Sequence, residues 1–148
     1  MKTKTPTDNL TLLPHEVLEK VSKSKTPITK VKTLQNNDSF ALKTILQAYY
    51  RDDVVFDLPP GIPPYREDDG LPGEQVQTIN KAIRNLKNCV VQSKIPKWKK
   101  EQTFIRLLET VHAKDAKVLL DVQDKTLEAS YPGLTRKIVV KAYPTLQL

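Results

Sequence analysis

Apolar residues recur with a helical period along most of this chain, most clearly in residues 76–90. Within that segment the apolar positions are three or four residues apart, the spacing that places side chains on one face of an α-helix. These positions are Val76, Ile79, Ile83, Leu86 and Val90. The pattern predicts one continuous amphipathic helix that begins after Gly73.

The segment that follows Pro96 repeats this pattern, with Phe104, Leu107, Leu108 and Val111 on the expected buried face. A third, shorter helix is predicted for AKDAKVLLDVQDK, residues 113–125, where apolar side chains again share one face. The boundary between these two helices is expected near residues 112–116.

Three further segments carry helix signals at their ends. Pro14 suits a first helical turn, and Pro27 is expected to end the helix that begins there. Asp38 or Ser39 can cap a helix over FALKTILQAYY, residues 40–50. Thr135 can cap a helix that stops before Pro144. The β-branched run IVV in this last segment makes a strand the competing prediction.

Residues 57–74, DLPPGIPPYREDDGLPGE, interrupt the helical pattern with five prolines and three glycines. Proline fixes φ and lacks a backbone donor, so this segment is expected to lie extended outside any helix or central strand. Leu58, Ile62 and Tyr65 are predicted to hold it across the helices as a belt. The alternative is a proline-rich ligand for an aromatic groove on another protein.

Together these patterns predict an all-α fold: a compact bundle of about five to seven short helices with a proline-rich extended connecting segment. Residues 1–10 are expected to form a flexible tail. Residues 11–148 are expected to form a single helical domain, in which 57–74 is a proline-rich acidic loop.

The net charge of +7 is unevenly distributed along the chain. Residues 51–75 carry two basic and seven acidic side chains, whereas residues 76–148 carry fourteen basic and six acidic ones. A basic surface of this kind attracts polyanions or acidic partners, although solvated lysines also occur on proteins without such partners.

The strongest candidate contacts are basic residues on the two long predicted helices, together with one indole. They are Lys81, Arg84, Lys87, Lys97, Trp98, Lys99 and Lys100. Lysines at a helix start oppose the helix dipole unless a bound anion shares the site. An indole among them can stack on a base while the lysines hold phosphates. The alternatives are that Trp98 packs on a neighbouring helix and that the lysines form a solvated surface.

Other functional classes find little support in the sequence. His15 and His112 have no matched nucleophile or metal-ligand neighbour, and no phosphate-binding or nucleophile motif occurs. Cys89 is the single cysteine and is expected to be a packing residue. The acidic clusters lack the spacing of a metal-binding loop, and no apolar run reaches the roughly 18 residues of a membrane span. We therefore expect no enzyme activity, cofactor, metal, membrane association or small-molecule substrate.

A resemblance to a known family extends over roughly residues 38–148. It is carried by three segments, LPPGIPPY, FIRLLETVHAKDAKVLLDVQDKTL and YPGLTRKIVVKAYP. Their combination resembles an uncharacterised family of small proteins from T4-like tailed phages, notably the myoviruses of cyanobacteria. The resemblance implies a phage protein made in the host cytoplasm, with the virion as a second location. It carries over no catalytic or binding residue, because that family has no assigned activity.

The sequence thus predicts a non-enzymatic phage accessory protein that binds nucleic acid, or a nucleic-acid-processing partner from host or phage, through a basic helical face. The alternatives are a virion structural or assembly protein and an inhibitor of a host enzyme whose acidic loop mimics nucleic-acid charge.

Overall fold

The computed structural model describes residues 12–67 and 76–148, and the predicted tail over residues 1–10 lies outside these ranges. The described residues form eight α-helices and one 3₁₀ helix, η1. In chain order these are α1 (Pro14–Lys23), α2 (Pro27–Asn36), α3 (Phe40–Tyr50), α4 (Val76–Ala82), η1 (Ile83–Cys89), α5 (Lys97–Thr110), α6 (Ala113–Asp124), α7 (Leu127–Ser130) and α8 (Arg136–Ala142). The all-α prediction is confirmed, with more helices than the five to seven expected.

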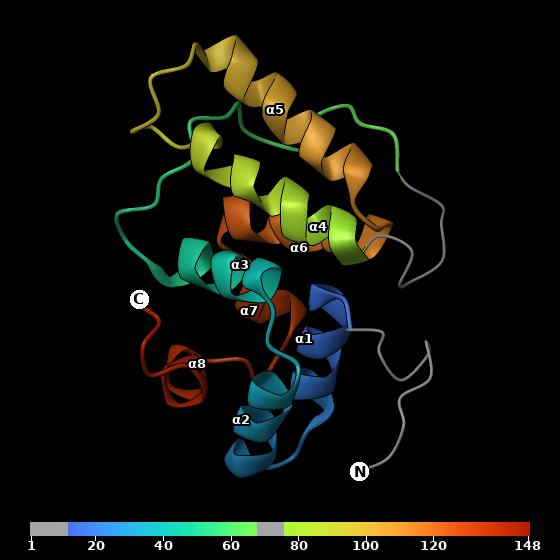
Figure 1. Ribbon diagram of the computed structural model, residues 1–148, viewed down its shortest axis with the longest axis vertical. Helices are drawn as coiled ribbons and strands as arrows, with labels where there is room; N and C mark the ends of the chain where they lie inside the picture. Colours follow the sequence, from blue (N-terminus) through green and yellow to red (C-terminus); the bar gives the residue numbers. More distant parts are fainter. Residues whose placement is uncertain (1–11, 68–75) are drawn as a thin grey trace.

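The helices pack in two groups along an elongated molecule (Figure 1). At one end α5 packs against η1 and α6. At the other end α2 packs against both α1 and α8. The third helix, α3, lies between the two groups and contacts both α6 and α4. A single cluster of buried apolar side chains, drawn from all of these elements, connects the two ends.

Short polar side chains begin three of the helices. The hydroxyls of Thr26, Ser39 and Thr135 accept hydrogen bonds from the backbone N–H groups of Thr29, Leu42 and Ile138, respectively. Ser39 and Thr135 were predicted as caps, and both predictions are confirmed. Such a bond satisfies a backbone donor that the first helical turn leaves unpaired.

One prediction about helix extent is wrong, and one helix was not predicted. The helix from Pro14 ends at Lys23, before Pro27, as predicted. Pro27 is also the first residue of the unpredicted helix α2, a position that suits its fixed φ. The segment from Val76 is not one continuous α-helix, since it tightens into the 3₁₀ helix η1 at Ile83. In the last segment the strand alternative is wrong, because residues 138–140 lie within α8.

The proline-rich strap, which we define as residues 51–67, crosses the molecule beside η1 and α5. Phe56 and Val90 form an isolated antiparallel bridge, in which the Asp57 N–H donates to the Cys89 carbonyl at 2.8 Å. Leu58 and Tyr65 pack against the core as predicted, but Ile62 is 71% exposed and does not clamp the helices. The rest of the predicted acidic loop, residues 68–74, lies outside the described residues.

One buried polar contact joins α1 to α6. Asp115 is fully buried, and its Oδ1 accepts hydrogen bonds from the His15 backbone N–H at 2.9 Å and pairs with His15 Nδ1 at 2.8 Å. The His15 ring stacks on His112, with centroids 4.8 Å apart. The carboxylate therefore satisfies a donor in the first turn of α1 from 100 residues away in sequence.

We predict that Asp115→Ala lowers the free energy of unfolding by about 2–4 kcal/mol, because it leaves buried donors on His15 without a partner. Urea unfolding followed by circular dichroism measures the change. Asp124→Ala, at the exposed end of the same helix, is the matched control and should cost less than about 0.5 kcal/mol. Equal effects of the two substitutions would contradict a special role for Asp115.

Candidate nucleic-acid interface

The side chains of η1 fall into three rows, because a 3₁₀ helix has three residues per turn and side chains three apart are eclipsed. Ile83, Leu86 and Cys89 form the buried row. Arg84 and Lys87 form an exposed row on the α3 side of η1, and Asn85 and Asn88 form another row on the α5 side. The predicted contacts Lys81, Arg84 and Lys87 therefore do not all point the same way.

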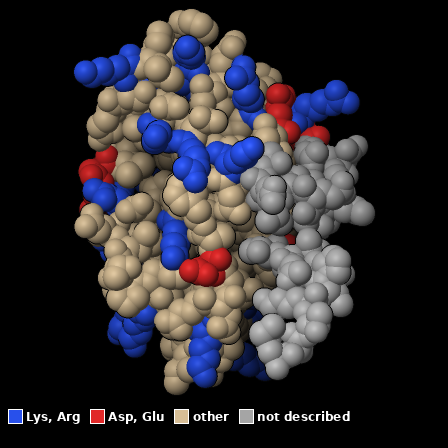
Figure 2. Space-filling model, viewed as in Figure 1, with Lys and Arg blue, Asp and Glu red and all other residues tan. Residues whose placement is uncertain are grey.

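A polar groove of about 390 Å³ separates η1 from α5. Lys81 and the Asn85–Asn88 row line one wall, and Thr103, Arg106 and Thr110 line the other. Neither Lys81 nor Arg106 makes an ion pair with a carboxylate in residues 12–67 or 76–148. In Figure 2 Lys and Arg side chains lie over the upper part of the molecule, where α4 and α5 are, and also over its middle and lower end. The groove thus presents cations and neutral donors, a combination that suits an anion.

Lys99 extends this basic wall along α5. It is exposed and lies seven residues before Arg106, which is about two helical turns, so both side chains leave the helix on the same side. Arg106 was not among the contacts predicted from the sequence. Its seven-residue spacing from Lys99 was the signal that could have placed it there.

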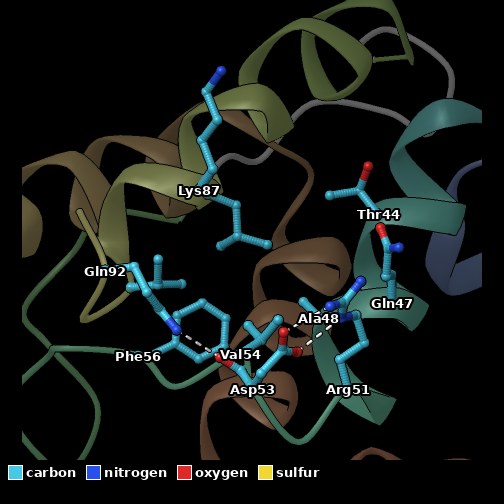
Figure 3. A pocket seen from close by; sticks show the side chains of 11 residues that line it. Thr44, Gln47, Ala48, Arg51, Asp53, Val54, Phe56, Lys87 and Gln92 are labelled. Atoms are coloured by element: carbon cyan, nitrogen blue, oxygen red, sulfur yellow. Dashed lines mark hydrogen bonds and ion pairs between the residues drawn. The ribbon is translucent and has the colours of Figure 1, made fainter. Parts of the chain in front are cut away.

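Arg84 and Lys87 face a second pocket on the other side of η1. The Arg84 guanidinium lies over the Phe40 ring at the start of α3, 4.9 Å from its centroid. Lys87 lines a pocket of about 410 Å³ between η1 and α3, and Figure 3 shows its ammonium pointing away from the pocket floor. Both side chains are exposed, and neither pairs with a carboxylate in the described parts of the chain.

Lys100 does not belong to the exposed surface, contrary to the expectation that it contacts a ligand. Only 3% of its side chain is exposed, and its Nζ donates to Asp57 Oδ2 at 2.9 Å. Lys97 Nζ lies 3.7 Å from the other oxygen of the same carboxylate but remains largely exposed. Hydrogen bonding from Lys100 holds the pKa of Asp57 below its ordinary value. Lys100 therefore anchors the strap to α5, since its position in the sequence brings it to the buried side of the helix.

Trp98 is 64% exposed, so the interpretation that it packs on a neighbouring helix is wrong. At about 100° per residue it lies about 80° from Arg106 and about 140° from Thr103 around the helix. The indole is therefore accessible at the outer edge of the basic face, outside the groove itself.

The remaining reactive side chains are occupied by packing. Cys89 is buried, and burial raises the pKa of its thiol to about 11, so it stays protonated at neutral pH. His15 pairs with Asp115, and His112 Nδ1 accepts from the Lys114 backbone N–H at the start of α6. Within the described ranges no cluster of three or more His, Cys, Asp or Glu residues could hold a metal ion.

Fold and site together define an all-α protein with a basic, polar groove between two neighbouring helices. Residues 17–129 match the model of a family of unknown function, DUF6433, and the chain belongs to this family. No curated protein and no solved structure shows a significant match to the chain. In the ranges that the structure describes, no helix has both the length and the apolar character needed to cross a membrane.

We predict that Asp57→Asn lowers the thermal unfolding temperature near pH 7, because it leaves the buried Lys100 ammonium without a counter-charge. Replacing Lys100 with Met in the same chain removes the stranded charge and should restore part of the loss. Circular dichroism melts of the three proteins measure both effects.

The pH dependence of this contribution has a definite sign. Because pairing lowers the pKa of Asp57 in the folded state, its contribution is present above the unfolded pKa, near pH 4, and is lost as pH falls through the lowered value. The difference between wild type and Asp57→Asn should therefore shrink in acid. A difference that stays constant from pH 7 to pH 2 would contradict the ion pair as its cause.

Proposed function

We propose that this chain is a non-enzymatic phage accessory protein that binds nucleic acid through the basic face of α4, η1 and α5. The observation that carries the proposal is the groove between η1 and α5, in which Lys81 and Arg106 stand opposite each other with no described carboxylate lining the walls. Phosphate oxygens of a nucleic-acid backbone match the cations and the amide and hydroxyl donors of this groove.

The proposed contact set is Lys81, Arg84, Lys87, Lys99 and Arg106, with Lys97 and Trp98 at its outer edge. Lys100 leaves the set because it is buried against Asp57. The same ion pair, with the Arg51–Asp53 pair, neutralises two of the strap carboxylates. Part of the negative charge of the strap is therefore neutralised within the molecule. This favours a protein that binds an anionic partner over one whose strap mimics the charge of nucleic acid.

The association constant for a short oligonucleotide should fall linearly with salt concentration on logarithmic axes, because binding releases counterions from phosphates. With about four phosphate contacts, the slope should be roughly −3 for a single strand. Fluorescence anisotropy of a labelled oligonucleotide between 50 and about 300 mM salt measures it.

The charge-reversed double variant Lys81→Glu/Arg106→Glu should bind roughly tenfold or more weakly and reduce the slope by about 1.5. Lys25→Glu/Lys32→Glu changes the net charge equally, but its exposed lysines lie at or near α2, at the other end of the molecule. It is the matched control and should retain most of the affinity. If the two double variants lose affinity equally, the attraction is a property of net charge and the groove has no special role.

A further inference from the structure

The second pocket, between η1 and α3, has an apolar floor and a polar rim. Val54, Phe56, Leu86 and Val90 form much of the floor, and Figure 3 shows the Phe56 ring at its base. Thr44, Gln47 and Ala48 lie on one face of α3 and form the opposite wall, which Arg51 continues directly after the helix. A pocket of about 410 Å³ with this lining is suited to a flat, largely apolar ring with polar edges.

The charges around this pocket favour an anionic group at its mouth. Arg51 and Asp53 line it together, but they form two hydrogen bonds with each other, at 2.8 and 2.6 Å, so their charges cancel locally. Lys87 remains as a cation without a described carboxylate partner, and Arg84 stands one 3₁₀ turn before it in the same exposed row. A phosphate attached to a ring in the pocket would lie within this positive field.

The two hollows flank the same short helix. The polar groove lies on the α5 side of η1 and the apolar pocket lies on its α3 side, with Lys81 in the first and Lys87 in the second. A nucleic-acid strand that crosses η1 would meet cations on both sides of this helix, but it would meet an apolar cavity only on the α3 side. That asymmetry matches a nucleotide chain, which has a charged backbone along one edge and apolar-faced bases along the other.

We propose that the pocket between η1 and α3 receives one unpaired base of a single-stranded nucleic acid, with the neighbouring phosphates held by Arg84 and Lys87. This inference rests on the proposed function and narrows it to single strands. In a duplex each base is paired and stacked, so its faces are covered, whereas the bases of a single strand can turn out and stack on an aromatic side chain such as Phe56.

The test compares three DNA probes of about 12 nucleotides. The first is a single strand, the second is the same strand with abasic residues throughout, and the third is the duplex of the first strand, in which the bases are paired. The abasic strand retains the phosphates and loses the rings. Fluorescence anisotropy at a fixed salt concentration should show the wild-type protein binding the base-bearing strand at least about tenfold more tightly than the abasic strand. The duplex should also bind more weakly than the base-bearing single strand.

A pocket-filling variant locates the effect. Thr44 is half-buried on the pocket wall, so Thr44→Trp should occupy the cavity and bring affinity for the base-bearing strand close to that for the abasic strand. Thr44→Ser, which keeps the hydroxyl and leaves the cavity open, should bind as the wild type does. Circular dichroism establishes that both variants are folded, and the abasic comparison on the wild-type protein needs no variant.

Equal wild-type affinity for base-bearing and abasic strands would overturn the base pocket while leaving the salt-dependent binding of the proposed function intact. A folded Thr44→Trp that keeps the preference for bases would place the base elsewhere and also overturn it. Absence of binding to all three probes would overturn the proposed function, and this inference with it.

Discussion

The arrangement of the basic face depends on the tightening of the backbone from α-helix to 3₁₀ helix at Ile83. Six residues of α-helix turn through about 600°, which would carry Cys89 about 120° away from Ile83, whereas two 3₁₀ turns bring it back into line. In the 3₁₀ form Cys89 is buried with Ile83 and Leu86, and its carbonyl is free to accept from the Asp57 N–H of the strap. The same geometry separates the Arg84–Lys87 row from the Asn85–Asn88 row and so creates two differently lined hollows.

The strap completes this arrangement by positioning carboxylates away from the face. Asp57 is bound to Lys100 on the buried side of α5, and Glu109 of the same helix accepts from the Arg66 backbone N–H of the strap at 2.8 Å. Both contacts use acidic groups between strap and helix. The prolines restrict the strap in the unfolded chain, so fixing it costs less conformational entropy than fixing a flexible loop of equal length. The stiff acidic strap therefore holds onto α5, and part of its negative charge is neutralised by contacts within the molecule.

The sequence was informative where structure is local. The N-caps at Ser39 and Thr135 depend on residues three positions away, and the buried faces of α5 and α6 follow directly from their apolar spacing. The first residues of α2 also carried a local signal, since Thr26 followed by Pro27 is a typical helix start. It was missed because α2 buries only Leu34 and has little apolar pattern of its own. Contacts with α8 support it, and so does the hydrogen bond at 2.5 Å to the Leu34 carbonyl from the hydroxyl of Tyr143, the residue after α8.

The candidate site could be predicted only in part, because its geometry depends on contacts between distant segments. Burial of Lys100 requires Asp57, which lies 43 residues earlier and reaches it through the fold. The 3₁₀ conformation of η1 likewise depends on the strap and on packing of Cys89, whose Sγ lies 3.7 Å from the Lys100 carbonyl of α5. Sequence spacing therefore identified which elements carry the cations. It treated Lys81, Arg84 and Lys87 as lying along one continuous helix, whereas Lys81 lies on the α5 side of η1 and the other two lie on its α3 side.

The most direct test of a single basic face on α4, η1 and α5 is a residue-by-residue map of binding. The ¹⁵N-labelled protein would be titrated with a short single-stranded oligonucleotide and followed by two-dimensional NMR. The account predicts that the largest shift changes fall in residues 81–88 and 99–110 and around the pocket at residues 44–56, while residues of α2 and α8 remain unchanged. Changes concentrated on α2 and α8, or spread evenly over the surface, would contradict it.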